Sequence, residues 1–143
     1  MAFYKCIPLG KKKISFIDES HHLVDSYVNT RNYISNDYVS DSIKFTPQPS
    51  GSWAGMRFSK LIPASAKTVR VRCGAIYANY AYVGVSTNPN ASDPSHCIKG
   101  SYIDNVFYQA YKTYTFDIAD IHQPLYLFVG CPNEFHVSLA EAE

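Results

Sequence analysis

Apolar and polar side chains alternate with a period of two along most of the chain after residue 52. The clearest segment is 67–78, where Val69, Val71 and Cys73 share one face and Arg70 and Arg72 share the other. This alternation indicates a strand with one buried face. The same period predicts strands near 56–59, 80–86, 103–108, 113–118, 125–131 and 135–139. Inward positions on these strands predict core residues that include Val71, Cys73, Phe116, Leu127 and Val129.

Clusters of Pro, Gly, Asn and Asp separate the predicted strands, as at 47–52 and 132–133. Short strands spaced roughly 8–15 residues apart between such turns are typical of an antiparallel sandwich. We therefore predict an all-β protein, an antiparallel jelly-roll-like β-sandwich over residues 46–143. The last predicted strand, 135–139, has Phe135, Val137 and Leu139 at alternate positions.

Residues 1–45 show no sustained period, and the stretch 21–41 is rich in Asn, Asp, Ser and Tyr. That pattern predicts an irregular N-terminal extension with one strand near 25–34. Apolar residues near its start need a covering surface, which is either their own sandwich or a partner protein, and the lysines beside them favour an acidic docking surface. We expect this arm to attach the protein to a partner. The attachment candidates are Phe3, Tyr4, Lys11, Lys12 and Lys13.

The 143 residues carry 13 Lys and Arg against 12 Asp and Glu, for a net charge of +1. This balance argues against nucleic-acid binding, which favours a basic excess. No signal peptide or long apolar span is evident, so we expect synthesis in the cytoplasm and no membrane contact. Cys73 and Cys131 fall at inward positions and are expected to be small buried side chains, with a disulfide as the alternative.

No nucleophile or metal-ligand motif is present, and the acidic residues are scattered over turns. The sequence therefore predicts a non-enzyme with no cofactor and no bound metal. Residues 87–101 form a long segment rich in Asn, Pro and Ser. With the following residues to 108, we expect it to be the exposed and variable part of the molecule.

Tyrosine is abundant, with 12 residues, and one domain of this size cannot bury all of them. Exposed tyrosines among Asn and Ser are typical of binding surfaces, and aromatic faces stack on sugars. Two alternatives stay open: tyrosines that only decorate strands, and tyrosines that form subunit contacts. The ligand-binding candidates are Trp53, Tyr77, Tyr80, Tyr82, Tyr102 and Tyr108.

Five short sequence segments occur in a distinctive order over residues 51–143: 51–58, 67–71, 81–86, 114–118 and 125–130. In that order they resemble the galactose-binding-like or jelly-roll modules of phage tail-fibre, baseplate and head-fibre or decoration proteins. Residues 1–50 lie outside this resemblance.

The resemblance implies a non-enzymatic bacteriophage virion protein, a head or tail decoration or a fibre subunit, whose sandwich faces outward and contacts host-surface glycans. It also implies other virion proteins as partners and a homo-oligomer, most simply a trimer. The alternative is a free-standing carbohydrate-binding or adhesin-type module. If the arm only attaches the protein, deleting residues 1–20 should leave a folded domain.

Overall fold

A computed structural model of the protein describes residues 13–75, 81–103 and 111–143. These residues form eleven strands and one short 3-10 helix, and none of their helices is long and apolar enough to cross a membrane. The elements are β1 (Ile14–Ser15), β2 (Tyr27–Arg31), β3 (Tyr33–Val39), β4 (Ser42–Gln48), β5 (Ala54–Phe58), β6 (Thr68–Ala75), β7 (Tyr82–Ser86), η1 (Pro94–His96), β8 (Lys99–Tyr102), β9 (Lys112–Asp117), β10 (Tyr126–Cys131) and β11 (Phe135–Ala142).

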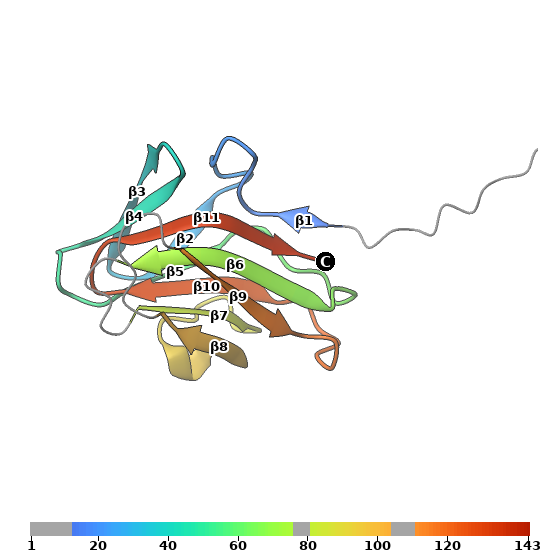
Figure 1. Ribbon diagram of the computed structural model, residues 1–143. Coiled ribbons are helices and arrows are strands. Elements are labelled where there is room, and N and C mark those ends of the chain that lie inside the picture. The colour runs from blue at the N-terminus through green and yellow to red at the C-terminus, as the bar shows by residue number, and fades with distance from the viewer. Residues whose placement is uncertain (1–12, 76–80, 104–110) are drawn as a thin grey trace, which may run out of the picture.

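Two antiparallel sheets face each other, which confirms the predicted β-sandwich. The first sheet has the strand order β3-β4-β11-β6-β9, with β1 paired to the end of β11. The second sheet has the order β2-β5-β10-β7-β8. In Figure 1, β3 and β8 lie at opposite extremes of the molecule, and β1 lies beside the C-terminus.

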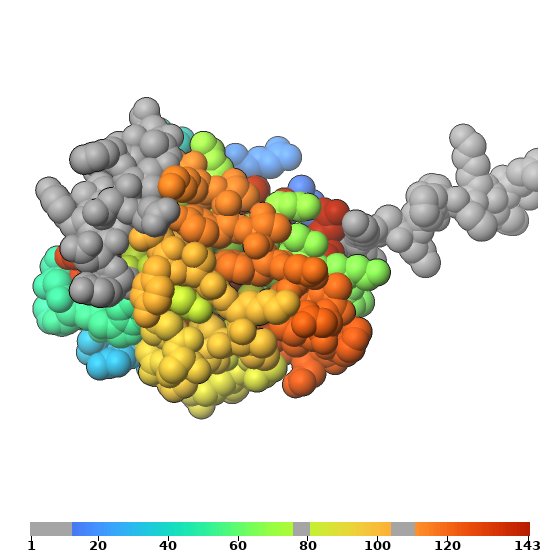
Figure 2. Space-filling view, turned by 60° about the horizontal axis from the view of Figure 1, so that its bottom comes forward, coloured from blue at the N-terminus to red at the C-terminus, as the bar shows by residue number. Residues whose placement is uncertain are grey.

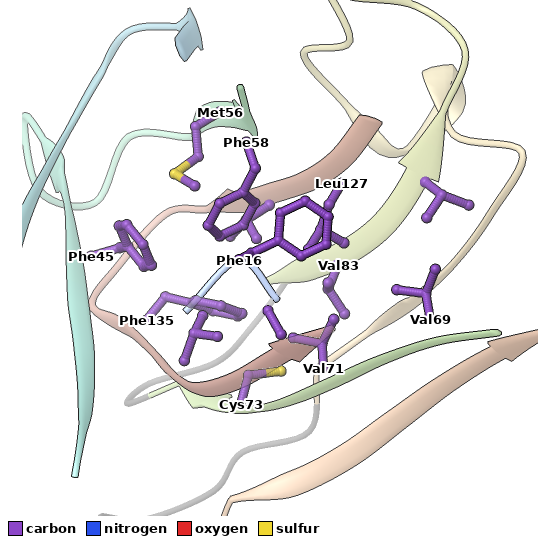
Figure 3. Packing of buried hydrophobic residues seen from close by; sticks show 14 of the residues in the cluster. Phe16, Phe45, Met56, Phe58, Val69, Val71, Cys73, Val83, Leu127 and Phe135 are labelled. Atoms are coloured by element: carbon purple, nitrogen blue, oxygen red, sulfur yellow. The ribbon is translucent and has the colours of Figure 1, made fainter. Parts of the chain in front are cut away.

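The space between the sheets holds one continuous hydrophobic core. Figure 3 shows aromatic rings from several strands converging there, with Phe45 and Phe58 in edge-to-face contact 6.3 Å apart. Alternation explains this packing, because each strand buries every second side chain. The five predicted core residues, Val71, Cys73, Phe116, Leu127 and Val129, are all buried, as expected.

The N-terminal part of the chain corrects the sequence prediction. β2, β3 and most of β4 lie within residues 1–45, and they are integral strands of the two sheets. Phe16 is buried in the core and its ring lies 5.4 Å from that of Phe58. The boundary predicted between residues 45 and 46 falls inside β4, so residues 14–45 belong to the sandwich and not to a separate arm.

Two other strands also differ from prediction. β8 occupies 99–102 and so overlaps the end of the loop predicted at 87–101. Residues 104–108 of the strand predicted at 103–108 lie outside the described residues. On β11 the register shifts between Val137 and Leu139. This bulge turns Leu139 to the outer face, where it is half-buried opposite Arg72, and brings Ala140 inward instead.

Candidate functional site

Three of the predicted ligand-binding residues come together on the outer face of the β2-β5-β10-β7-β8 sheet. Trp53 directly precedes β5, Tyr82 begins β7 and Tyr102 ends β8. The strand register pairs Tyr82 with Tyr102 on one side and with Gly130 on the other. Long-range pairing thus aligns three aromatic side chains at one end of the sheet, here called the aromatic row.

Glycines form the floor of the aromatic row. A Cβ at Gly130 would collide with the six-membered ring of Trp53, and a Cβ at Gly100 would collide with the ring and hydroxyl of Tyr82. Both rings therefore lie against bare backbone, a close approach that only glycine permits. Tyr102 meets Tyr82 edge-on at 5.0 Å and is 56% exposed. The row thus extends from the half-buried indole of Trp53 to the solvent-exposed phenol ring of Tyr102.

A second, smaller hydrophobic cluster lies outside this sheet. Residues 87–98, here called the outer loop, fold over the face and insert the fully buried Ala91 against Tyr82 and Phe128. Trp53 and Cys97 pack against the same cluster. Figure 2 shows the yellow residues of this region and β8 beside the orange β9 on one continuous surface.

The sheet holds the outer loop by its main chain. Three side chains on β5, on β7 or directly before β5 donate to carbonyl oxygens of the loop. The bonds join Trp53 Nε1 to Ser92 O (2.9 Å), Arg57 Nε to Pro89 O (3.0 Å) and Ser86 Oγ to His96 O (2.6 Å). The 87–98 part of the predicted variable loop is thus anchored over a cluster of its own, since buried carbonyls need donors.

Asp93 organises the helical turn of the outer loop. Its Oδ1 accepts hydrogen bonds from the Ser95 hydroxyl and from the Ser95 N–H at 2.8 Å. These bonds, with the nearby His96 and Arg31, hold the pKa of Asp93 below its ordinary range. His96 Nδ1 accepts a hydrogen bond from the Ser92 N–H at 3.0 Å, so this nitrogen carries a lone pair.

Polar groups border the Trp53 end of the row. Asn32 donates through Nδ2 to the Trp53 carbonyl at 2.7 Å, and its own φ of 55° places it at the crossing from β2 to β3. Arg31 directly precedes Asn32 with an exposed side chain, and its charge acts on the half-buried Asp93 of the outer loop. An aromatic surface rimmed by amide, carboxylate and guanidinium groups can stack on an apolar ring face and hydrogen-bond its hydroxyl groups.

The other predicted site residues have different outcomes. Lys13 pairs with Glu141 at 2.8 Å, which raises the pKa of Lys13, and Arg70 lies 3.7 Å from the same carboxylate. Lys13 is thereby tied to the first sheet. The remaining candidates lie outside the described residues: Phe3, Tyr4, Lys11, Lys12, Tyr77, Tyr80 and Tyr108.

Sequence analysis missed a polar network on the outer face of the first sheet. His136 is buried, with Nδ1 3.0 Å from Ser42 Oγ and 3.3 Å from the Tyr111 hydroxyl, and Nε2 2.8 Å from Glu134. Ser42 and Tyr111 also bond to Asp41. Ser, His and Glu in contact are the groups of an acyl-transfer relay, but Ser42 is fully buried and cannot meet a substrate. The network therefore joins strands.

The described cysteines are free thiols inside or against the two clusters. Burial raises the pKa of Cys131 and of Cys97 to about 12, and raises that of Cys73 further, so none is a reactive thiolate. The burial predicted for Cys73 and Cys131 is confirmed. Among residues 13–75, 81–103 and 111–143, no group of three His, Cys, Asp or Glu side chains is arranged to hold a metal ion.

The sequence matches no protein-family model and no curated protein. The fold, however, is similar to that of solved carbohydrate-binding modules of family 29. A variant of the module CBM29-2 has a TM-score of 0.62 at 12% identity, covering 93% of this chain and 92% of that one. CBM29-2 variants complexed with cellulohexaose and with mannohexaose each have a TM-score of 0.60 at 11% identity.

A second kind of neighbour is part of a larger enzyme. The glycoside hydrolase domain structure of Endo-D from Streptococcus pneumoniae R6 has a TM-score of 0.52 at 15% identity, covering 82% of this chain but 21% of that one. These likenesses establish the architecture, a β-sandwich of the kind found in family 29 carbohydrate-binding modules.

Proposed function

We propose that this protein is a non-catalytic glycan-binding module, and that the aromatic row is its binding surface. Two independent observations support the proposal. The fold covers nearly the whole of the solved family 29 modules, two of which are complexed with hexasaccharides. The row places Tyr102, 56% exposed, beside the glycine-backed rings of Tyr82 and Trp53.

The row suits sugars for a physical reason. A pyranose ring has an apolar face of C–H groups, which gains by stacking on an aromatic ring, and an equator of hydroxyl groups, which need hydrogen-bond partners. Tyr102 offers the first contact, while Asn32, Arg31 and Asp93 offer the second near Trp53. Because glycines and the outer loop hold Trp53 and Tyr82 in place, little conformational entropy is lost when a ligand binds.

The exposed position of Tyr102 is the observation that carries the proposal, and it can be tested directly. We expect calorimetric titration with cellulohexaose, mannohexaose and a wider glycan panel to find a bound oligosaccharide. Tyr102→Ala should then weaken binding about five- to tenfold, the effect of losing one stacked ring at about 1–1.5 kcal/mol.

Tyr33→Ala is the matched control, because Tyr33 is 54% exposed but lies at the edge of the first sheet. It should leave binding unchanged. Absence of binding to any glycan in the panel, or equal affinity of the wild type and Tyr102→Ala, would contradict the proposal. Thermal unfolding of each variant shows that the fold is intact.

The role in a virion stays a prediction of the sequence resemblance, as do the trimer and the attachment function of the first residues. Copurification of the protein with phage particles tests the virion role. Light scattering on the isolated protein tests the oligomeric state. These experiments are independent of glycan binding, since a particle protein and a free-standing module could use the same aromatic row.

A further inference from the structure

Arg57 is held rigidly on the outer face of β5 by two contacts. Its guanidinium carbon lies 4.5 Å from the centre of the Tyr126 ring, and its Nε donates to the Pro89 carbonyl at 3.0 Å. Stacking fixes the plane of the guanidinium group and the hydrogen bond fixes its rotation within that plane. An arginine side chain with so little freedom has already lost most of the entropy that ligand binding would cost.

Arg57 has no acidic partner among the described residues. Some other basic side chains do pair with carboxylates: Lys99 lies 3.0 Å from Asp120, and Arg70 lies 3.7 Å from Glu141. Within residues 13–75, 81–103 and 111–143, no carboxylate oxygen lies within 4.0 Å of the Arg57 guanidinium, and its two terminal NH₂ groups make no hydrogen bond there. The two terminal NH₂ groups of Arg57 are therefore hydrogen-bond donors that lie side by side in one fixed plane.

A planar guanidinium fork matches a carboxylate, which accepts two parallel hydrogen bonds. Arg57 and the Tyr126 ring beneath it are each half-buried, so solvent covers the guanidinium group only in part. We propose that Arg57 binds the carboxylate of an acidic sugar unit, such as a uronic acid. This inference rests on the proposed glycan-binding function and names the chemical class of ligand that it favours.

The position of Arg57 fits such a role. The outer loop runs between Arg57, which binds Pro89, and Trp53, which binds Ser92. Arg57 and Trp53 thus lie on the same sheet face, and each holds a carbonyl in the first half of the outer loop. Val28, 40% exposed, lies directly across from Arg57 on β2 and provides an apolar neighbour for a sugar ring.

The test compares glucuronate with glucuronamide, which keeps the sugar ring but lacks the charge. We expect the Arg57 Nε–H and Tyr126 ring resonances to shift with glucuronate, less so as salt is raised, and not with glucuronamide. In Arg57→Lys, the affinity for glucuronate, measured from the Tyr126 ring resonances, should fall about tenfold, because lysine keeps the charge but loses the planar pair of donors. Equal shifts with both compounds, or none with glucuronate, would overturn the proposal.

Two controls separate the possible failures. Arg72→Lys removes another arginine over an aromatic ring, 5.8 Å from Tyr111 on the other sheet, and should leave the glucuronate response unchanged. The Trp53 indole resonance, followed with neutral oligosaccharides, tests the aromatic row alone. If Trp53 responds and Arg57 does not, only the acidic subsite fails. If the Arg57 resonance shifts with glucuronate but no glycan shifts the Trp53 resonance, the proposal that the aromatic row binds glycans is wrong.

Discussion

Asn29 on β2 and Ile34 on β3 are joined across the two sheets: the Asn29 amide oxygen accepts the Ile34 N–H at 2.9 Å. The Tyr27 hydroxyl donates to the Ile34 carbonyl at 2.6 Å. Ile34 lies opposite Pro47, which has no N–H, and both main-chain groups of Ile34 bond to these β2 side chains instead of to β4. Side chains of the neighbouring sheet therefore satisfy the free edge of β3 at Ile34, a position where another chain could otherwise pair.

Removing this protection should expose the edge. We expect Asn29→Ala to lower the free energy of unfolding by about 1–2 kcal/mol, because it leaves the Ile34 N–H unpaired. It should also increase concentration-dependent association, which light scattering measures. The control is Asn90→Ala, an exposed asparagine on the outer loop. If Asn29→Ala associates no more than this control, β3 is protected by other means.

The buried ring of Phe16 separates two N-terminal deletions. Removing residues 1–12 should leave a folded domain, because Phe16 and β1 are retained. Removing residues 1–20 should unfold it or destabilise it severely, since loss of a buried phenylalanine alone costs about 3–5 kcal/mol. Circular dichroism and urea unfolding measure both. A folded 1–20 deletion would restore the idea of a separate arm.

Two leucines on adjoining segments test the bulge in β11. Leu127 is fully buried, so Leu127→Ala should cost about 2–5 kcal/mol. Leu139 is turned outward by the register shift, so Leu139→Ala should cost about 1 kcal/mol or less. Urea denaturation of both variants checks the difference. Equal costs would mean that β11 keeps a regular register through residue 139.

The glycine floor gives a spectroscopic prediction, because Trp53 is the only tryptophan of the chain. Gly130→Ala should displace the indole, shift its fluorescence and weaken glycan binding together. Thr113→Ala, exposed on β9 of the other sheet, is the control and should change neither signal. Unchanged fluorescence in Gly130→Ala would show that the ring does not lie on the backbone.

Asp93 makes the outer loop sensitive to acid. Its pKa is lowered in the folded protein, so its contribution is present above the ordinary aspartate range, about pH 3.9, and is lost as pH falls through the folded value. As the pH falls through that range, we expect the Ser95 amide and Trp53 indole resonances to shift, because the outer loop loosens when Asp93 is protonated. In Asp93→Asn these resonances should not shift over the same pH range. A titration that is identical in the variant would assign the effect to another group.

The sequence predicts well those strands that bury one regular face. In β6 and β10, alternation continues over the whole strand and turn residues follow, so both the strand and its inward side chains could be predicted. β2 falls within the single strand predicted near 25–34, whereas β3 was missed because the Asn and Asp residues of this region resemble turn formers. In the structure, Asn29 and Asp37 instead bond main-chain N–H groups along an exposed edge.

Only part of the candidate site can be predicted from the sequence, for a similar reason. Aromatic residues on outward positions can be read from the sequence, and they include Tyr82 and Tyr102. The glycines beneath them gain meaning only from pairing between distant strands, such as Tyr82 with Gly130. Neither the Arg57–Tyr126 contact nor the His136 network follows from spacing, because each joins segments more than 65 residues apart or on different strands.

The two hydrophobic clusters lie on opposite sides of β10, with Leu127 and Val129 facing the core and Phe128 facing the outer loop. Substitutions on one side therefore leave the packing on the other side largely unchanged. The outer loop and the aromatic residues that contact it can change in sequence while the sandwich keeps its stability. The ligand preference of the proposed glycan site can thus evolve, or be redesigned by exchanging residues 87–98, without a compensating change in the core.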